Sequence, residues 1–569
     1  PEDIERMVDH AAERSIDIIP VVSALGHMEH FLRHESLQHL SELAGCETDR
    51  FFTTGFHHNI CPSNEEAIAF IRTYLGEVAA LFPSSYFHAG FDEDFDIGWC
   101  PRCRERVREL GSADRLLGEH IATVRGILAE HGKTMMMWDD LFELWPGALE
   151  RAPRDVVMCT WCYDYLVHRP TGHFAHHPRI DRFAEYDRLG QPYMPCTYTW
   201  NVPNVASFTR YASFHKPLGA LVTNWERRVT FNHVGYPVFD FAAKLWTSPD
   251  PRHADVDELA NAVADDLAPD IAPDGRRAFI EFYHAPVKGF YYPDRADRFY
   301  GELMPVEHQR GRAMADIAAR LEPACKGNDV IEDMAVTLRE RLVRYRIRTW
   351  MMEHLWASLA DRDWPDRKPV QREIEAVKKR RLAQWARHRE GMDDKAVREH
   401  FKSMTDNLKT LATRIDKSTY FLMLRLFLPD RYSLPKLDVT IVDDHGGELS
   451  LLECETLKPM FDETPYFEIV VPYNAPHYPA AIRLEGYGFG GQGLAHVRIL
   501  GKGKRRGHVV RWMPEAVRRI DGVVKDPTHC FADNLQWTWL GEHDTPRSFA
   551  YDEHSRMRHT MEVAVERKE

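Results

Sequence analysis

Two adjacent carboxylates, Asp92 and Glu93, follow a short apolar run and a glycine within residues 85–94. The pattern predicts a buried strand over 86–89, a turn at Gly90, and the two acids directly after it. Parallel strands of α/β barrels carry their chemistry at their carboxyl ends. Neighbouring carboxylates repel each other, so one is expected to keep its proton while the other ionises. Cleavage of a glycosidic bond needs this combination of a proton donor and a nearby negative charge.

An acidic surface loop is the alternative interpretation of the same pair, so the surrounding elements matter. Between residues 17 and 246 the sequence alternates predicted strands with helical stretches. The strands are expected at 17–22, 86–89, 134–138, 156–161, 193–198 and 220–225, and the helices at 1–15, 64–81, 113–130, 181–189 and 236–246. This alternation predicts a parallel sheet with helices outside it. Six such units are two short of eight, so we expect a TIM-type (β/α)8 barrel that lacks its first strands.

Polar and aromatic residues recur where these predicted strands end. They are His27, Asp92 and Glu93, Trp138 and Asp139, Trp161, Tyr198 and Trp200, and Trp225 and Glu226. A doubly wound sheet gathers its ligand groups at one switch point. Here every strand contributes, which favours the mouth of a barrel.

Four of these residues are tryptophans, each at or just past the end of a different strand: Trp138, Trp161, Trp200 and Trp225. A single tryptophan in such a place is more often part of the core. Four at equivalent positions favour a binding pocket, because the apolar C–H faces of sugar rings pack on indole. Such a pocket would also hold a small acyl group.

Two histidines accompany the acids. His88 lies inside the predicted strand, where a buried core histidine and a site residue are equally consistent with the pattern. His27 follows Gly26 in a loop at a strand end, where it could donate to a sugar hydroxyl or assist the catalytic acid.

Two metal sites can be considered. If the segment after residue 26 is helical, His27, His30 and His34 share a face, and Asp92 could complete a zinc site. A carboxylate-rich, aromatic mouth is not typical of a hydrolytic metal site, so we expect no metal ligand and no cofactor there. Without a second pair of cysteines nearby, the motif Cys-Pro-Arg-Cys at 100–103 is at most half of a zinc site. A cross-link that holds the loop, or two free thiols, is the favoured interpretation.

The character of the chain changes after residue 250. Long helical periodicities over 306–321, 331–360 and 372–415 predict a helical bundle in 251–432. Short alternating strands at 437–442, 466–471, 481–485 and 496–500 predict a β-sandwich accessory domain in 433–569. Residues 1–250 would then form the catalytic barrel.

Bulk properties narrow the class of protein. The chain has 569 residues, 44% hydrophobic and 28% charged, which is ordinary for a soluble protein of several domains. Its formal charge of −14 argues against nucleic-acid or anionic-membrane partners, and no apolar run is long enough to span a bilayer. The chain begins with Pro1 in an apparent helix, so we expect a truncated N-terminus. Ten scattered cysteines favour a cytoplasmic protein. The helical bundle could support a homodimer.

The motifs resemble a known family. The run HAGFDE at residues 88–93 resembles the H-x-G-x-D-E signature of glycoside hydrolase family 20, the β-N-acetylhexosaminidases. The run at 19–27, ending in Leu-Gly-His, resembles the strand-three loop of the smaller bacterial members. The resemblance covers residues 1–250 well, the helical part loosely and the β-sandwich not at all.

The resemblance implies a substrate-assisted retaining mechanism, in which the 2-acetamido carbonyl of the substrate attacks the anomeric carbon. By the motif, Glu93 would be the general acid/base, and Asp92 would orient the acetamido nitrogen. Trp138, Trp161 and Trp225 would enclose the acetamido methyl group, and Tyr198 would donate to its carbonyl oxygen. The other expected substrate contacts are His27, His88, Trp200, where the family often has an aspartate, and Glu226.

The expected activity is therefore the removal of terminal β-linked N-acetylhexosamine, GlcNAc or GalNAc, from a glycan. A non-catalytic sugar-binding protein with the same pocket is the alternative, because the predicted barrel lacks two strands. A metal-dependent deacetylase is a third hypothesis.

Overall fold

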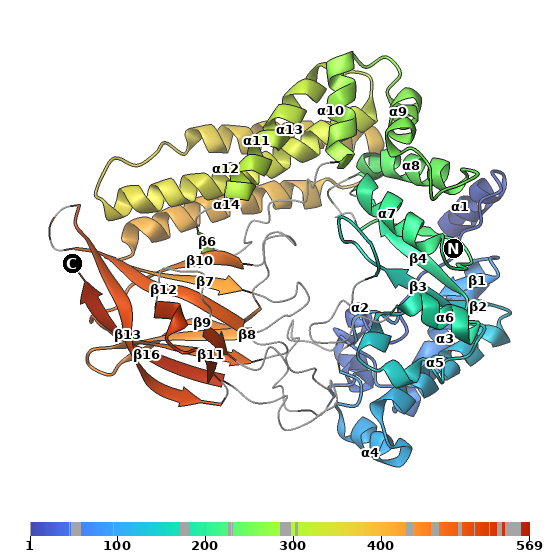
Figure 1. Ribbon diagram of the computed structural model, residues 1–569, viewed down its shortest axis with the longest axis horizontal. Coiled ribbons are helices and arrows are strands. Elements are labelled where there is room, and N and C mark those ends of the chain that lie inside the picture. The colour runs from blue at the N-terminus through green and yellow to red at the C-terminus, as the bar shows by residue number, and fades with distance from the viewer. Residues whose placement is uncertain are drawn as a thin grey trace.

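A computed structural model describes most of the chain. The described residues are 2–44, 46, 58–94, 96–170, 181–199, 201–225, 229, 231–284, 297–301, 305–427, 436–456, 466–487, 492–503, 505, 507–522, 524–531, 538–540 and 559–568. In Figure 1 an α/β part, a set of long helices and a large β-sheet follow one another along the chain.

The α/β part is built on one parallel sheet. Its strands are β1 (Tyr86–His88), β2 (Thr134–Trp138), β3 (Val157–Trp161), β4 (Tyr193–Tyr198) and β5 (Leu221–Thr223). They neighbour one another in sequence order, and every pair is parallel. The predicted parallel sheet is confirmed, as a five-stranded half-barrel.

The strand expected at 17–22 is reduced to a single bridge, in which Val21 pairs in parallel with His88 of β1. The backbone N–H of His88 donates to the carbonyl of Pro20 at 3.0 Å, and that of Val22 donates back to His88 at 3.0 Å. Proline has no N–H to extend the ladder, which limits strand pairing at this edge. The segment nevertheless runs beside β1 and delivers the following loop to the end of that strand.

Helices precede and follow these strands along the chain. They are α1 (Glu2–Ala12), α2 (Glu29–Leu32), α3 (Glu65–Leu81), α4 (Pro101–Leu110), α5 (Ala113–Glu130), α6 (Arg182–Leu189), α7 (Val202–Ala212) and α8 (Tyr236–Trp246). Helix α5 begins where the Ser112 side chain accepts from the N–H of Arg115, an N-cap. Its buried residues Leu117, Ile121, Val124 and Leu128 recur every three or four positions. This face packs on β2 and α3 and forms the core.

The next region is helical, as predicted. It contains α9 (Val256–Leu267), α10 (Pro273–His284), α11 (Pro305–Leu321), α12 (Asp329–Leu359), α13 (Lys368–His388) and α14 (Lys395–Lys417). The single periodic stretch at 372–415 is two helices, because Gly391 at φ 76° lies in the break between them. A buried ion pair joins α13 to α12, with Arg381 Nη1 2.6 Å from Asp333 Oδ1 and both side chains 0% exposed.

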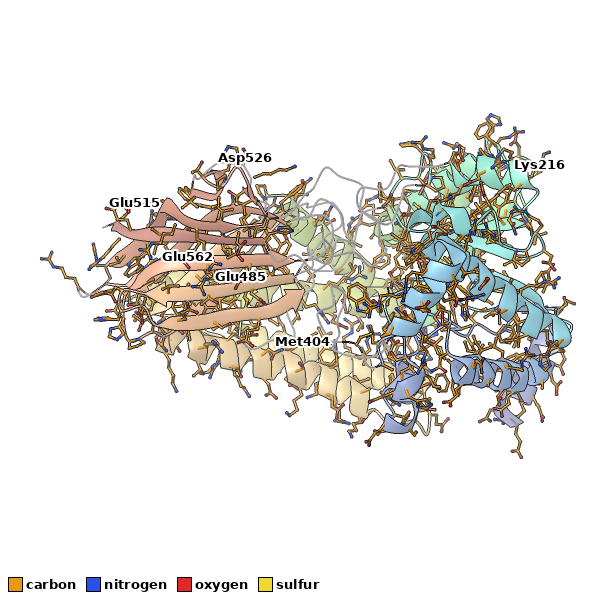
Figure 2. All side chains as sticks on the ribbon, turned by 90° about the horizontal axis from the view of Figure 1, so that it is seen from below. Lys216, Met404, Glu485, Glu515, Asp526 and Glu562 are labelled. Atoms are coloured by element: carbon orange, nitrogen blue, oxygen red, sulfur yellow. The ribbon has the colours of Figure 1, made fainter. Side chains whose placement is uncertain are left out.

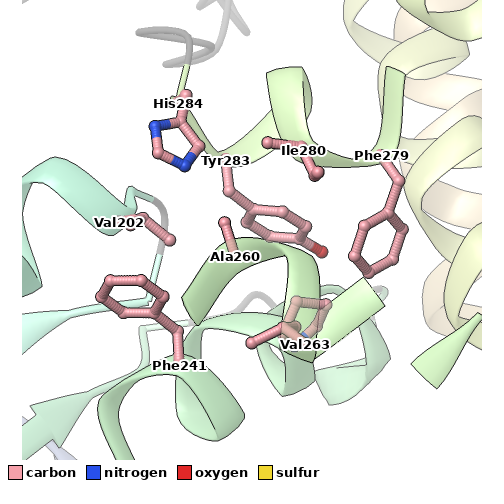
Figure 3. Close-up of a pocket in the computed structure, with 9 residues that line it drawn as sticks. Val202, Phe241, Ala260, Val263, Phe279, Ile280, Tyr283 and His284 are labelled. Atoms are coloured by element: carbon pink, nitrogen blue, oxygen red, sulfur yellow. The ribbon is translucent and has the colours of Figure 1, made fainter. Parts of the chain in front are cut away.

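A small apolar pocket lies where α7 to α10 meet (Figure 3). It is lined by Val202, Pro237, Phe241, Ala260, Val263, Phe279, Ile280, Tyr283 and His284. The Tyr283 hydroxyl donates to the carbonyl of Val234 at 2.9 Å, and burial lowers the pKa of His284. No pair of acids lines this pocket, so its lining gives no reason to place the chemistry there.

The C-terminal part is a large antiparallel sheet. Its strands are β6 (Phe299–Tyr300), β7 (Tyr420–Phe427), β8 (Lys436–Asp443), β9 (Glu448–Thr456), β10 (Tyr466–Tyr473), β11 (Pro479–Tyr487), β12 (Gln492–Lys502), β13 (Val509–Asp521), β14 (Val524–Lys525), β15 (Thr538–Leu540) and β16 (His559–Lys568). The main path runs β6-β10-β7-β12-β13-β16-β11-β8-β9. All four strands predicted from alternation are present. Two more, β6 and β7, come from the stretch predicted to be helical, so the sheet begins before residue 433.

The long helices lie along this sheet (Figure 1), and α14 is tied to it. Arg414 Nε donates to the carbonyl of Pro472 at 3.2 Å, and Lys502 Nζ donates to the carbonyl of Asp416 at 2.9 Å. In Figure 2, Lys216 marks the half-barrel end, while Glu485 and Glu562, from the paired strands β11 and β16, mark the opposite end. Among the described residues no helix has the length and apolar character to cross a bilayer.

Candidate active site

The turn after β1 places Asp92 and Glu93 in an unusual backbone conformation. Gly90, Phe91 and Glu93 have φ values of 73°, 79° and 52°. A residue other than glycine held at positive φ costs on the order of 1–3 kcal/mol and persists only where its surroundings fix it. Here Phe91 is fully buried, and the N–H of Trp138 donates to the carbonyl of Gly90 at 2.9 Å. The turn is therefore held between the core below and β2 beside it.

A second loop is pressed against this turn. A Cβ on Gly26 would lie 2.5 Å from the backbone carbonyl oxygen of Asp92, so only glycine fits at this position. The next residue, His27, has φ 55°. The close approach of the two backbones brings the imidazole of His27 to the acids, as the sequence hypothesis requires.

His27 lies between the two carboxylates. Its Nε2 is 3.2 Å from Asp92 Oδ2 and 3.5 Å from Glu93 Oε2. Burial alone would lower the pKa of His27, but the hydrogen bonds to Asp92 and Glu93 outweigh it and raise the pKa to about 11. His27 therefore favours its protonated form and links the two acids through its Nε2.

The other side of His27 faces a third carboxylate. Glu29 Oε1 is 4.0 Å from His27 Nδ1, and Glu29 Oε2 is 3.1 Å from His58 Nδ1. The hydrogen bond with His58 lowers the pKa of Glu29 to about 2. The rings of His27 and His58 meet edge to face at 4.5 Å. The result is a polar chain from His58 through Glu29 and His27 to the acid pair.

We expect His27 to stabilise the fold most at low pH. A histidine whose pKa is raised by folding contributes fully below its unfolded pKa of about 6.5, and that contribution is lost as the pH rises toward about 11. Thermal unfolding of wild type and His27→Gln from about pH 6 to about pH 10.5 should show a stability difference that shrinks steadily with pH. In an Asp92→Asn, Glu93→Gln background the slope should flatten. A difference that vanishes already near pH 7 would contradict the ion bridge.

An aspartate without a role in the sequence hypothesis connects the acidic turn to β3. Asp140 Oδ2 accepts from the N–H of Glu93 at 2.9 Å, and its Oδ1 accepts from Trp161 Nε1 at 3.1 Å. Asp139 beside it is 3% exposed and accepts from Thr160 Oγ1 at 2.5 Å and from the Tyr186 hydroxyl at 2.6 Å. The sequence signal that could have pointed to Asp139 and Asp140 is their position, because these two acids directly follow the predicted strand at 134–138.

Aromatic rings line the ends of the strands. The ring centroids of Trp138 and Trp225 are 6.3 Å apart, and those of Trp161 and Tyr163 are 5.0 Å apart. Tyr163 lies 4.9 Å from Tyr198 and accepts at its hydroxyl from Trp225 Nε1 at 2.9 Å. Trp138 and Trp161 are 6% exposed, whereas Trp225 is 55% exposed. The structure brings these residues into one aromatic wall beside the acidic turn.

Tyr163 was missed by the sequence hypothesis, although it follows Trp161 by two residues. Burial raises its pKa, so its hydroxyl keeps its proton and can donate. Its ring lies between those of Trp161 and Tyr198.

His88 supports the turn from within β1. It is 2% exposed, its Nδ1 accepts from the N–H of Gly90 at 3.1 Å, and its ring lies 4.5 Å from that of Trp138. Two further predicted contacts, Trp200 and Glu226, lie outside the described residues.

The histidine cluster considered for zinc is different from the one expected. Helix α2 contains only 29–32, so His27 precedes it and shares no helical face with His30 and His34, which are exposed. His27 instead meets Glu29 and His58, whose ligand-type atoms lie within 4.8 Å of one another. These three groups already satisfy one another by ion pairing, and His27 is turned toward the acid pair.

Part of the chain matches a known family of glycoside hydrolases. Residues 1–171 match the model of the glycosyl hydrolase family 20 catalytic domain. The chain is 29% identical over 170 residues to hexosaminidase D of Bos taurus, and 32% identical over 165 residues to a β-hexosaminidase of Porphyromonas gingivalis. These matches take in 29% and 28% of this chain, and 46% and 20% of the relatives. The chain therefore spans less than half the length of either relative.

Among solved structures, this chain is similar to the exo β-N-acetylglucosaminidase of Vibrio harveyi in complex with N-acetylglucosamine. The TM-score is 0.34 at 19% identity, over 50% of this chain and 46% of that one.

Proposed function

We propose that this chain, whose residues 1–171 match the model of the glycosyl hydrolase family 20 catalytic domain, is a glycosidase that removes terminal β-linked N-acetylhexosamine from glycans. The observation that supports this most is the pairing of Asp92 and Glu93 through His27, beside an aromatic wall. Neither a surface loop nor a core ion pair requires two acids, one imidazolium and several indoles at the carboxyl ends of parallel strands.

In the proposed mechanism the substrate supplies its own nucleophile. The carbonyl oxygen of the 2-acetamido group attacks the anomeric carbon as the glycosidic bond breaks, and Glu93 gives a proton to the departing oxygen. Water then opens the oxazolinium ion, with Glu93 taking a proton from that water. Retention of configuration follows because two inversions occur at the same carbon.

Asp92 has an electrostatic role in this scheme. Positive charge develops on the acetamido nitrogen as its carbonyl attacks, and a fixed carboxylate stabilises that charge most in the transition state. His27 keeps Asp92 and Glu93 at a constant separation, and Asp140 holds the backbone of Glu93. Both are positioning residues for the reacting groups.

The aromatic residues would hold the acyl group. Trp138, Trp161 and Trp225 are proposed to surround the acetamido methyl, and Tyr198 to donate to its carbonyl oxygen. Tyr163 joins this set because its hydroxyl accepts from Trp225 Nε1 and fixes the exposed indole. An indole that is 55% exposed without such a bond would be free to rotate.

The wider architecture is proposed to follow the family. The five parallel strands in sequence order would be part of a (β/α)8 barrel in residues 1–250, followed by a helical domain and a β accessory domain. His88 and the undescribed Trp200 and Glu226 are proposed as further substrate contacts.

The proposal is tested with 4-nitrophenyl β-glycosides of GlcNAc, GalNAc and glucose. Release of nitrophenol from the two acetamido sugars, with little or none from the glucoside, is the expected result. Saturable binding of GlcNAc by calorimetry with no turnover of any glycoside would instead favour the non-catalytic sugar-binding protein. Release of acetate without nitrophenol, abolished by a chelator, would indicate a metal-dependent deacetylase.

A further inference from the structure

Three cysteines and a glutamate meet in the hydrophobic core at the start of α4. Glu42, Cys61 and Cys103 are 0% exposed and Cys100 is 3% exposed. Their ligand-type atoms all lie within 4.8 Å of one another. Only two of them, the pair at 100–103, are close in sequence. The other two arrive from the segment between α2 and α3.

The distances fit one tetrahedral cation. Cys61 Sγ is 3.6 Å from the sulfurs of Cys100 and of Cys103, and Glu42 Oε2 is 3.0 Å from Cys103 Sγ. Thiolates about 2.3 Å from a central Zn²⁺ at tetrahedral angles stand about 3.8 Å apart, and a carboxylate oxygen comes closer still. The same sulfurs are too far apart for a disulfide, whose bond is about 2.0 Å.

The chemistry of the four groups points the same way. Glu42 is fully buried, and its two carboxylate oxygens meet the N–H of Cys100 and the thiol of Cys103. Buried carboxylates and thiolates are costly without a cation and become favourable when they coordinate one.

We propose that Glu42, Cys61, Cys100 and Cys103 form a structural site for one Zn²⁺ ion. Four protein ligands close the coordination sphere, as in structural rather than catalytic zinc sites. The surroundings supply further contacts. Glu42 Oε1 accepts from the N–H of Cys100 at 2.9 Å, and Ser63 Oγ is 3.0 Å from Cys103 Sγ. Cys100 caps α4, because its sulfur accepts from the N–H of Cys103.

The site would tie three separate segments together next to the active site. Asn59, two residues before Cys61, donates to Asp94 at 2.5 Å and Asp96 at 2.6 Å in the loop that follows the acids. His58 contacts Glu29 and, through its ring, His27. Zinc would therefore fix the segment that carries His58 and Asn59 against the turn that carries Asp92 and Glu93.

Metal analysis of the protein purified under reducing conditions tests this directly. We expect one zinc per chain, and X-ray absorption at the zinc edge should show three sulfur ligands at about 2.3 Å and one oxygen. Exchange with Co²⁺ should give the strong charge-transfer and d–d bands of a tetrahedral thiolate site. A folded wild type that binds no zinc or cobalt when both are offered, or a zinc without sulfur ligands, would overturn the proposal.

Variants then assign the ligands. Cys61→Ser and Glu42→Gln should lose zinc and unfold at lower temperature. Cys325 is a half-buried cysteine in the helical region, so Cys325→Ser should keep its zinc and the unfolding temperature of the wild type. Zinc retained at full stoichiometry in Cys61→Ser, or a Cys61 disulfide found by mass spectrometry of the alkylated native protein, counts against the site. These measurements do not use glycosidase activity. Loss of zinc binding and loss of the proposed function are therefore distinguished.

Discussion

Replacing Glu93 with Gln is expected to lower kcat/KM for an N-acetylglucosaminide with a poor leaving group about 10²–10⁴-fold, the usual contribution of a general acid. The amide has nearly the same shape and keeps the backbone hydrogen bond from Glu93 to Asp140. It cannot deliver a proton to the departing oxygen. The loss should therefore come from chemistry and leave the fold intact.

The dependence on leaving group makes this prediction specific. An acidic phenol such as 2,4-dinitrophenol needs no proton, so its glycoside should be cleaved by Glu93→Gln at a rate much closer to that of wild type. The matched control is Glu119→Gln, because Glu119 lies on an exposed surface of α5 and pairs with Arg106. This variant should leave the cleavage rates of both substrates unchanged. An equal loss for good and poor leaving groups would mean that Glu93 is not the acid.

Replacing Asp92 with Asn is the second large effect. The carboxylate acts on charge that appears only in the transition state, so kcat should fall about 10²–10³-fold with a smaller change in KM. In contrast to Glu93→Gln, the loss should persist for the dinitrophenyl glycoside, because participation of the acetamido group is impaired whatever the leaving group.

Two controls accompany Asp92→Asn. Asp155→Asn removes an exposed acid that pairs with Arg125 and should leave the kinetics unchanged. Asp92 also contacts His27, so the variant should lower the pKa of His27 and thereby shift the pH dependence of stability described above. A variant with unchanged kcat would remove Asp92 from the proposed mechanism.

Local patterns were enough to predict the elements that carry the site. The apolar run before Gly90 predicted β1 and placed Asp92 and Glu93 at its end, and period-two alternation located the C-terminal strands. The turn before the acids could be expected, because Gly90 follows the strand directly and has φ 73°. These features depend on neighbours in sequence, which a pattern can report.

Contacts between distant segments could not be predicted. Cys100 and Cys103 form only half of a site until Glu42 and Cys61 are brought to them from 39 to 61 residues away. The zinc alternative at His27, His30 and His34 assumed a helix that begins only at Glu29. The strand expected at 17–22 pairs through Val21 alone, because Pro20 offers no N–H. In each case tertiary packing, and not local propensity, decided the outcome.

Participation of the substrate acetamido group is the central claim, and one series of substrates tests it most directly. Aryl β-glucosaminides carrying N-acetyl, N-fluoroacetyl, N-difluoroacetyl and N-trifluoroacetyl groups differ in the nucleophilicity of one carbonyl oxygen and little in shape. For the wild-type protein we predict that kcat/KM falls steeply with each added fluorine. A rate that is independent of the number of fluorine atoms would contradict the mechanism proposed for Asp92 and Glu93.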